Sequence, residues 1–445
     1  MAAPVLTLPR RWIAPLVVVV LVVAGVTVTV VATRDGRGCS AGTSLPARSP
    51  LLDKAGMADQ PDPRLDKLTA AVDAMGPPLG GVRAGVGFDY GQWLHLYGVS
   101  GGVLAWTKNN APVTYLDDQS LAARWSLRPA TKRTAWDASA DRFLLLGLAA
   151  RHGTRVGSFE LATGESRWCT ELSARQRDGE PVATAFLDGG DVLVALPGHD
   201  GLEMTRLSAR HGRQVWQRTM AGVDRADYLA PLGPDLVLAG GTEEFRLADV
   251  DSTGRGGSVI SAFSARDGSA VWSWGGGADT IAHVIGVAGE QVLLELRTAQ
   301  GLQLVSLATS NGSVSWQRPL PTAAFSSTLR GGTVLVKSNA QVVAFDATDG
   351  KQRWSFDIPT DRTFFPYGFT LGLMPSLDQT HVLVPTTTAL EVLDVTTGKH
   401  TDYPLPTDGL STTYWPYQLV STDKLIGVVT NTGGVLADRD VGGLG

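Results

Sequence analysis

The sequence is poor in cysteine, in charge and in clusters of basic residues. Two of the 445 residues are cysteines, 18% are charged, and the formal net charge is −5. Because nucleic acids attract dense positive charge, this composition argues against a nucleic-acid partner. None of the seven histidines stands at metal-ligand spacing from another, and no EF-hand-like acidic loop occurs. We therefore predict no catalytic residue, no cofactor and no metal site.

The two cysteines lie far apart in the chain and form no Cys-x-x-Cys motif. Cys39 follows a Gly-rich stretch, whereas Cys169 comes directly after Trp168 in a predicted strand. In an exported chain an even, low count allows one disulfide, which here would join Cys39 to Cys169. Two unpaired thiols are the alternative, because a disulfide needs a geometry that the sequence does not contain.

A long uncharged run lies near the N-terminus. It spans residues 12–32, and the 20 residues from Ile13 to Ala32 are enough to cross a hydrocarbon core of about 30 Å as a helix. A cleaved signal peptide has a shorter apolar core and small residues at its cleavage site. The run therefore predicts an uncleaved transmembrane signal anchor. We expect residues 1–11 to form a cytoplasmic tail and the rest of the chain to lie outside the cytoplasmic membrane.

Residues 33–80 are predicted to form a linker, or stalk, with one short helix. Their first part is rich in Gly, Ser, Ala and Pro, which is typical of a linker. Asp62 and Pro63 suit the N-cap and the first position of a helix, and apolar residues follow at helical spacing as far as Met75. We therefore expect a stalk helix near residues 62–76.

Residues 81–445 contain a repeated pair in which Gly is followed four residues later by Trp. Successive glycines lie between 38 residues (Gly312 to Gly350) and 56 residues (Gly212 to Gly268) apart. A repeat of this length, made of short Val-rich runs broken by Gly, is typical of the four-stranded blades of a propeller. The pairs are Gly164/Trp168, Gly212/Trp216, Gly268/Trp272, Gly312/Trp316 and Gly350/Trp354. Two degenerate copies keep only Trp125 or only Gly398.

The most complete copy of the repeat runs from Ala344 to Trp354, with the pattern Ala-x-Asp-x-x-x-Gly-x-x-x-Trp. This pattern resembles the repeat of the PQQ-binding-like (quinoprotein) β-propeller family, and the resemblance covers roughly residues 85–440. In that family the Trp of one blade docks against the neighbouring blade near the repeat turn. The resemblance therefore implies that the repeat anchors are structural. These are Trp125, Trp168, Trp216, Trp272, Trp316 and Trp354, with Gly164, Gly212, Gly268, Gly312, Gly350 and Gly398.

The predicted fold is an all-β propeller of four-stranded antiparallel blades in residues 81–445. The C-terminal stretch offers only three strands, from Tyr417 to Asp438. A strand near residues 82–89 would complete that sheet and close the ring, because closure removes an open sheet edge. The count is then eight blades, and it is seven if the terminal strands do not pair.

The resemblance has a catalytic and a non-catalytic branch. Quinoprotein dehydrogenases of the family bind PQQ and Ca²⁺, and many carry an adjacent Cys-Cys pair, which this chain lacks. The other branch is the propeller scaffold of the outer-membrane β-barrel assembly machinery. A Gly-x-Ser-x-Gly stretch at residues 98–102 is not an enzyme signature here, because the following Val103 to Trp106 is a predicted strand rather than a helix.

These observations favour a membrane-anchored, extracytoplasmic and non-enzymatic scaffold that binds other envelope proteins. The alternatives are a PQQ- and Ca²⁺-dependent dehydrogenase-like quinoprotein, and a ligand-sensing ectodomain that works through a membrane partner. Three stretches are candidate contact loops: residues 242–258, 364–367 and 414–417. The last two contain aromatic residues beside Pro, which suits a recognition surface or equally a cap over the core.

Overall fold

In the computed structural model most of the repeat region and several shorter segments are described. The described residues are 19–23, 26–30, 82–87, 94–107, 113–117, 123–127, 136–139, 141–148, 154–172, 183–198, 201–220, 223, 228–240, 259–275, 280–320, 326–338, 340–359, 373–375, 380–385, 389–404, 416–421, 425–430 and 433–438.

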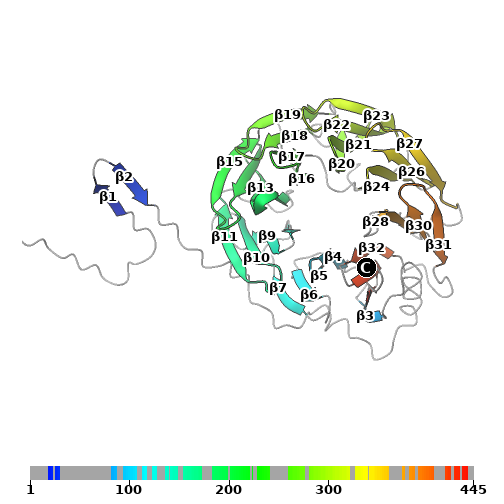
Figure 1. Cartoon of the computed structure of the whole chain (residues 1–445), viewed down its shortest axis with the longest axis horizontal. Helices are drawn as coiled ribbons and strands as arrows, with labels where there is room; N and C mark the ends of the chain where they lie inside the picture. The colour runs from blue at the N-terminus through cyan, green and yellow to red at the C-terminus, as the bar shows by residue number, and fades with distance from the viewer. Residues whose placement is uncertain are drawn as a thin grey trace, which may run out of the picture.

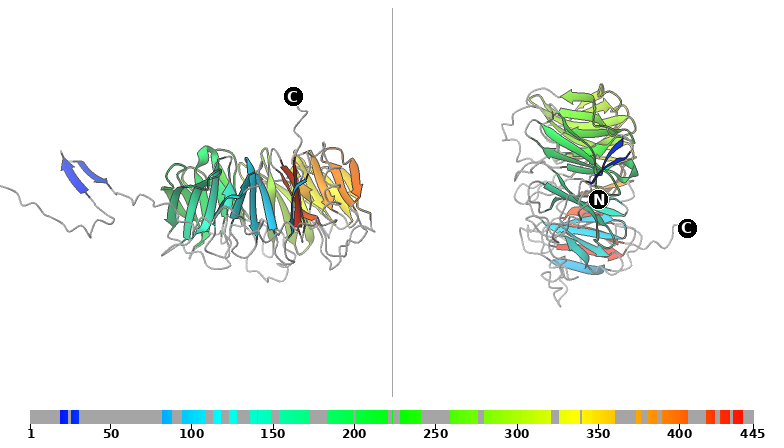
Figure 2. Two further views of the ribbon diagram at one scale, coloured as in Figure 1. Left: turned by 90° about the horizontal axis from the view of Figure 1, so that it is seen from below. Right: turned by 90° about the vertical axis from the view of Figure 1, so that its left-hand side faces the viewer.

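The described part of the repeat region forms eight four-stranded antiparallel sheets. Figure 1 shows them arranged as a ring around a centre, with one strand of each sheet innermost and one on the outer rim. Seen from the side, the sheets stand next to one another in a single layer (Figure 2). This is the architecture that the Gly–Trp repeat predicts, and we call the sheets blades 1 to 8.

The first four blades run in chain order from the innermost to the outermost strand. Blade 1 contains β4 (Leu94–Val99), β5 (Gly102–Thr107), β6 (Val113–Asp117) and β7 (Ala123–Leu127). Blade 2 contains β8 (Trp136–Ala138), β9 (Arg142–Leu148), β10 (Thr154–Glu160) and β11 (Ser166–Leu172). Blade 3 contains β12 (Ala183–Phe186), β13 (Val192–Pro197), β14 (Leu202–Leu207) and β15 (Gln214–Met220), with a short 3-10 turn at Asp188–Gly190. Blade 4 contains β16 (Tyr228–Pro231), β17 (Leu236–Gly240), β18 (Val259–Ser264) and β19 (Ala270–Gly275).

Three further blades repeat this order. Blade 5 contains β20 (Ile281–Ala288), β21 (Gln291–Thr298), β22 (Gly301–Ala308) and β23 (Val314–Pro319). Blade 6 contains β24 (Ser326–Arg330), β25 (Thr333–Lys337), β26 (Gln341–Asp346) and β27 (Gln352–Asp357). Blade 7 contains β28 (Met374–Pro375), β29 (His381–Pro385), β30 (Ala389–Asp394) and β31 (His400–Pro404).

Blade 8 closes the ring with strands from both ends of the repeat region. It contains β32 (Pro416–Ser421), β33 (Leu425–Thr430) and β34 (Gly433–Asp438), and its fourth strand is β3 (Val82–Gly87). β3 pairs antiparallel with β34, from Val82 opposite Ala437 to Gly87 opposite Gly433. The predicted closing strand near residues 82–89 is therefore confirmed, and with it the count of eight sheets.

The core lies between the blades. The second strands of the blades are continuous apolar runs, such as Val192 to Leu196, because they are covered by a neighbouring blade on each face. One buried cluster, for example, joins Leu193 of blade 3 to Val237 of blade 4, and the next joins Leu238 of blade 4 to Leu294 of blade 5. Alternate residues of one strand thus enter different clusters, as the period of two in a strand requires.

The structure differs from the sequence prediction at the N-terminus. The predicted anchor, residues 12–32, contains two short strands that pair only with each other, β1 (Val19–Val23) and β2 (Val26–Val30). The hairpin is consistent with the high strand propensity of Val and Thr, which fill most of these positions. No helix within the described ranges is long and apolar enough to span a membrane. The transmembrane anchor therefore stays a prediction, and the stalk helix near residues 62–76 lies outside the described residues.

Candidate interaction surface

Each of the six predicted tryptophan anchors lies on the outermost strand of one blade and reaches the repeat turn of the next blade. The indole Nε1 donates a hydrogen bond to a backbone carbonyl inside that turn, three residues before its glycine, over 2.7 to 3.2 Å. The pairs are Trp125 to Leu161, Trp168 to Ala209, Trp216 to Ala265, Trp272 to Thr309, Trp316 to Ala347 and Trp354 to Val395. A buried or half-buried indole therefore has both its apolar surface and its N–H satisfied.

The glycine of each repeat turn is needed where the indole packs. Gly350 has φ +68°, and a Cβ built on it would lie 2.5 Å from Cε3 of Trp316. Equivalent approaches bring Gly164 to Trp125, Gly212 to Trp168, Gly268 to Trp216, Gly312 to Trp272 and Gly398 to Trp354. Any other residue would have to adopt a left-handed backbone and displace a tryptophan. The predicted glycine and tryptophan anchors thus meet in space, each glycine with the tryptophan of the preceding blade.

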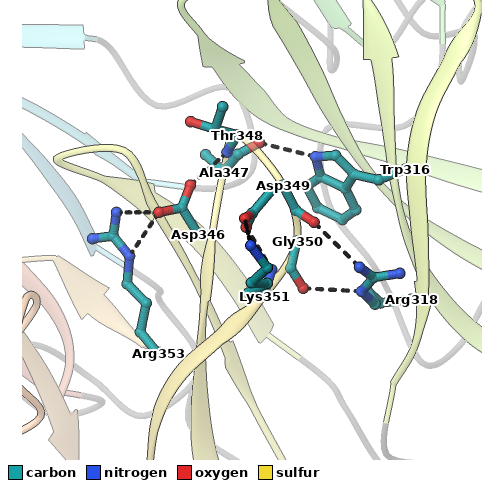
Figure 3. A network of polar contacts seen from close by, with 9 residues as sticks. All are labelled: Trp316, Arg318, Asp346, Ala347, Thr348, Asp349, Gly350, Lys351 and Arg353. Atoms are coloured by element: carbon teal, nitrogen blue, oxygen red, sulfur yellow. Dashed lines mark hydrogen bonds and ion pairs between the residues drawn. The ribbon is translucent and has the colours of Figure 1, made fainter.

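A polar network surrounds the turn between β26 and β27 (Figure 3). The Asp346 carboxylate accepts hydrogen bonds from Arg353, the shorter being 2.6 Å, and from the backbone N–H of Thr348 at 2.8 Å. These hydrogen bonds hold the pKa of Asp346 below its usual value, and the bond from Arg353 has the largest effect. From blade 5, Arg318 donates to the carbonyl of Gly350 at 3.1 Å. The polar groups of the turn are therefore engaged in local structure.

The acid–arginine pair seen at Asp346 and Arg353 divides the first six blades into two kinds. In blades 1, 2 and 6 an acidic residue at the start of the repeat turn bonds to the Arg that precedes the tryptophan. The pairs are Asp117–Arg124, Glu160–Arg167 and Asp346–Arg353. In blades 3, 4 and 5 the residues at both positions are uncharged. The pairs, in blade order, are Ser208 and Val215, Ser264 and Val271, and Ala308 and Ser315. Three consecutive blades therefore lack this charge pair on the rim.

The same three blades expose apolar side chains on their outermost strands. Val215 of β15 is 51% exposed, Val271 of β19 is 47% exposed and Val314 of β23 is 48% exposed. These strands follow one another along the outer rim in Figure 1, and each is hydrogen-bonded to a neighbouring strand on one side only. We call these three valines the rim sector. Sequence analysis missed it, although the signal is visible as Val, rather than Arg, directly before Trp216 and Trp272.

The structure describes only part of the candidate sites from sequence analysis. The Gly-x-Ser-x-Gly stretch is a hairpin in which Val99 of β4 pairs with Gly102 of β5, so the hairpin interpretation is confirmed. No group of three His, Cys, Asp or Glu side chains within the described ranges is placed to hold a metal ion. Residues 242–258 and 364–367 lie outside the described residues, and of residues 414–417 only the last two are described, at the start of β32.

Several ionisable residues are buried inside blades that are otherwise apolar. Glu295 of β21 and Glu391 of β30 are each 1% exposed, and Lys337 of β25 is 5% exposed. Burial lowers the pKa of Lys337 to about 8, because desolvation disfavours its charged form. These residues have no counterpart in the repeat pattern, and sequence analysis did not identify them.

Cys169 lies on β11, opposite Gly157, and packs against the buried cluster between blades 1 and 2. Its sulfur is bonded in a disulfide. Cys39 is the one other cysteine in the sequence, and it lies outside the described residues. The pairing of Cys39 with Cys169 therefore stays a prediction.

Comparison with known proteins supports the assignment of the repeat. Residues 255–436 match the family model described as outer membrane protein assembly factor BamB, and this range includes strands β18 to β33 and most of β34. No curated protein matches the chain.

Solved structures of low sequence identity resemble the chain. The propeller of Dos1 has a TM-score of 0.50 and 11% identity, covering 77% of this chain and 88% of its own. BamB from Moraxella catarrhalis has a TM-score of 0.49 and 18% identity, covering 81% of this chain and 99% of its own. A quinohemoprotein alcohol dehydrogenase, ADHIIG from Pseudomonas putida HK5, has a TM-score of 0.49 and 12% identity, covering 82% of this chain and 77% of its own.

The eight antiparallel sheets and the likeness to the Dos1 propeller define the class of fold as an all-β propeller. Over residues 255–436 the repeat is that of the PQQ-like β-propeller repeat family and is BamB-like, as its Gly–Trp pattern predicts.

The first prediction concerns the glycine of the repeat turn. Gly350→Ala should lower the free energy of unfolding by about 2 to 4 kcal/mol. The substitution forces Ala into a left-handed backbone conformation, and its Cβ clashes with the indole of Trp316. Gly332→Ala is the matched control, since Gly332 has φ +73° but open space around it, and it should lose only about 1 to 2 kcal/mol. Denaturant unfolding of the detergent-solubilised chain measures both, and equal losses would contradict the docking role.

The second prediction concerns Lys337 and pH. Its folded pKa of about 8 lies below the unfolded value near 10.4, so the unfolded state binds more protons between those two pH values. Stability should therefore rise with pH across this window, by up to about 3 kcal/mol. Lys337→Met should remove the rise, whereas Lys399→Met on the surface should keep it. Unfolding curves at a series of pH values test this, and identical pH slopes in the two variants would contradict it.

The third prediction concerns the disulfide. If Cys39 and Cys169 are paired as predicted, the wild-type chain should show no thiol that reacts with a maleimide after denaturation without reductant. Cys39→Ser should release one reactive thiol, which peptide mapping should locate at Cys169. One or two reactive thiols in the wild-type chain would show that the cysteines are not paired with each other.

Proposed function

We propose that this chain is a non-enzymatic protein-interaction scaffold of the cell envelope, with its propeller on the extracytoplasmic side of the cytoplasmic membrane. The observation that carries the proposal is the match of residues 255–436 to the family model described as an outer membrane assembly factor. The anchor of the proposed scaffold is the uncharged run at residues 12–32, which is long enough to span a bilayer as a helix.

The outer rim offers a docking position for an envelope partner. The rim sector places exposed Val215, Val271 and Val314 on three consecutive outermost strands, away from the acid–arginine pairs of blades 1, 2 and 6. Each of these strands also has one edge without a strand partner among the described residues. An extended segment of a partner can pair with such an edge while its apolar side chains contact the valine. The rim sector is therefore the described surface that best fits protein binding.

The fourth prediction tests this surface in cells. Crosslinking in intact cells, followed by purification of the tagged full-length chain, should recover a reproducible set of envelope proteins. Val271→Asp should reduce that recovery several-fold, because a carboxylate at the contact must be desolvated. Thr401→Asp is the matched control, since Thr401 is the exposed residue at the equivalent position of blade 7 and lies outside the rim sector.

Two outcomes would count against the proposal, and they are distinguishable. If nothing is recovered above an unrelated single-pass membrane protein, the scaffold function is wrong. If partners are recovered equally from the wild-type chain and from Val271→Asp, the scaffold function stands and the rim sector is not the docking surface.

A further inference from the structure

Glu295 occupies a position that is apolar in most other blades. It lies on β21, the second strand of blade 5, and its equivalents on the second strands of blades 2 and 3 are Leu146 and Ala195. Its side chain is 1% exposed. A carboxylate at such a position costs much free energy unless its charge is compensated and its oxygens are bonded. The repeat pattern therefore does not explain why a carboxyl group is buried at this position.

The strand register shows where Glu295 points. It lies opposite Leu304 of β22, and Leu304 belongs to the buried cluster between blades 5 and 6. From the other side, Ser327 of β24 lies opposite Val336 of β25, and Val336 belongs to the same cluster. Because cross-strand partners share a face, Glu295 and Ser327 enter the same layer from the two blades. Figure 1 shows β21 and β24 in these neighbouring sheets.

Both side chains carry a buried oxygen without a hydrogen-bond partner. Oε1 of Glu295 and Oγ of Ser327 are enclosed, and among the described residues neither atom has a hydrogen-bond partner. Two other titratable residues share this face of blade 5. His283 lies opposite Glu295, and Arg297 lies two residues further along β21. Neither residue donates a hydrogen bond to Oε1 of Glu295. The facing side of blade 6 contributes Leu329 and Val336, which are apolar. The two orphan oxygens thus come from independent elements and face the same layer between blades 5 and 6.

The chemistry of these donors selects the ligand. A water molecule satisfies an oxygen but brings no positive charge to a carboxyl group that is 1% exposed. A divalent ion usually takes several carboxylates or histidines, and no group of three such side chains is placed to hold one among the described residues. One carboxylate balances one positive charge, and carboxylate and hydroxyl oxygens are hard donors. A monovalent alkali cation fits both the charge and the donor type.

We propose that Glu295 and Ser327 form a binding site for a monovalent alkali cation, sodium or potassium, between blades 5 and 6. The site lies between the second strand of blade 5, β21, and the innermost strand of blade 6, β24. Bound cation neutralises the carboxylate and ties blade 5 to blade 6, so that it stabilises the ring at this junction. The proposal is independent of the scaffold function.

The test compares cations at equal ionic strength on the detergent-solubilised full-length chain. Sodium or potassium chloride should raise the unfolding midpoint of the wild-type chain by about 2 to 3 °C over tetramethylammonium chloride, because the large organic cation cannot enter a packed layer. Glu295→Gln should lose this difference, and in tetramethylammonium it should be at least as stable as the wild-type chain. Glu290→Gln, an exposed residue of the same hairpin, is the matched control and should keep the difference.

A second measurement does not depend on unfolding. The sodium NMR line should broaden in the presence of the wild-type chain and of Glu290→Gln, and broaden less with Glu295→Gln. If the midpoint of the wild-type chain is the same in sodium, potassium and tetramethylammonium, the proposal is wrong. It is also wrong if Glu295→Gln keeps either the midpoint difference or the full line broadening.

Discussion

The contact between a tryptophan and the glycine of the following blade is the constraint on which the ring depends. A four-stranded blade cannot cover its own two faces, so its stability comes largely from its neighbours. The indole joins blades at the rim, where the sheets diverge and ordinary side chains no longer fill the space. In the pair of Trp316 and Gly350, one hydrogen bond to Ala347 and one close packing contact fix the spacing between blades 5 and 6. Because the same contact recurs in six successive junctions, small errors in spacing do not accumulate around the ring.

This constraint leaves neighbouring positions free to change. The residue before each tryptophan points away from the docked indole, as alternation in a strand requires, so it does not take part in the contact. In blades 1, 2 and 6 that position is an Arg bonded to an acid across the turn, and in blades 3 and 4 it is an exposed Val. Exposed ion pairs contribute little stability, and their loss in consecutive blades is inexpensive for the fold. The rim therefore changes its surface chemistry without changing the architecture.

Much of the fold could be predicted from the sequence because its signals are local. Asp349-Gly350 and Trp354 mark a turn and the strand after it, and five intact copies of the pair give the period. The closing strand at Val82–Gly87 followed from counting three strands at the other end. The rim sector and Glu295 could not be predicted in the same way. Whether Val271 is exposed or Glu295 buried depends on which face of a strand meets the next blade, and this is known only when the blades are assembled. The Val-rich run near the N-terminus shows a further limit, because its composition suits a helix in lipid and a strand pair elsewhere.

The buried ionisable residues show how a repeat fold acquires individual sites. The second strands of blades 2 and 3 present Leu146 and Ala195 to the next blade, whereas blades 5 and 6 present Glu295 and Lys337 at the equivalent position. Each polar substitution acts on a single junction, because a blade contacts only its two neighbours. The cost of one buried charge is therefore confined to one interface, while the six tryptophan contacts keep the remaining junctions closed. A ring of nearly equivalent blades can for this reason tolerate a buried ionisable side chain at one junction. Such side chains occur at the junctions where the sequence departs from the apolar residues that the other blades have at the same position.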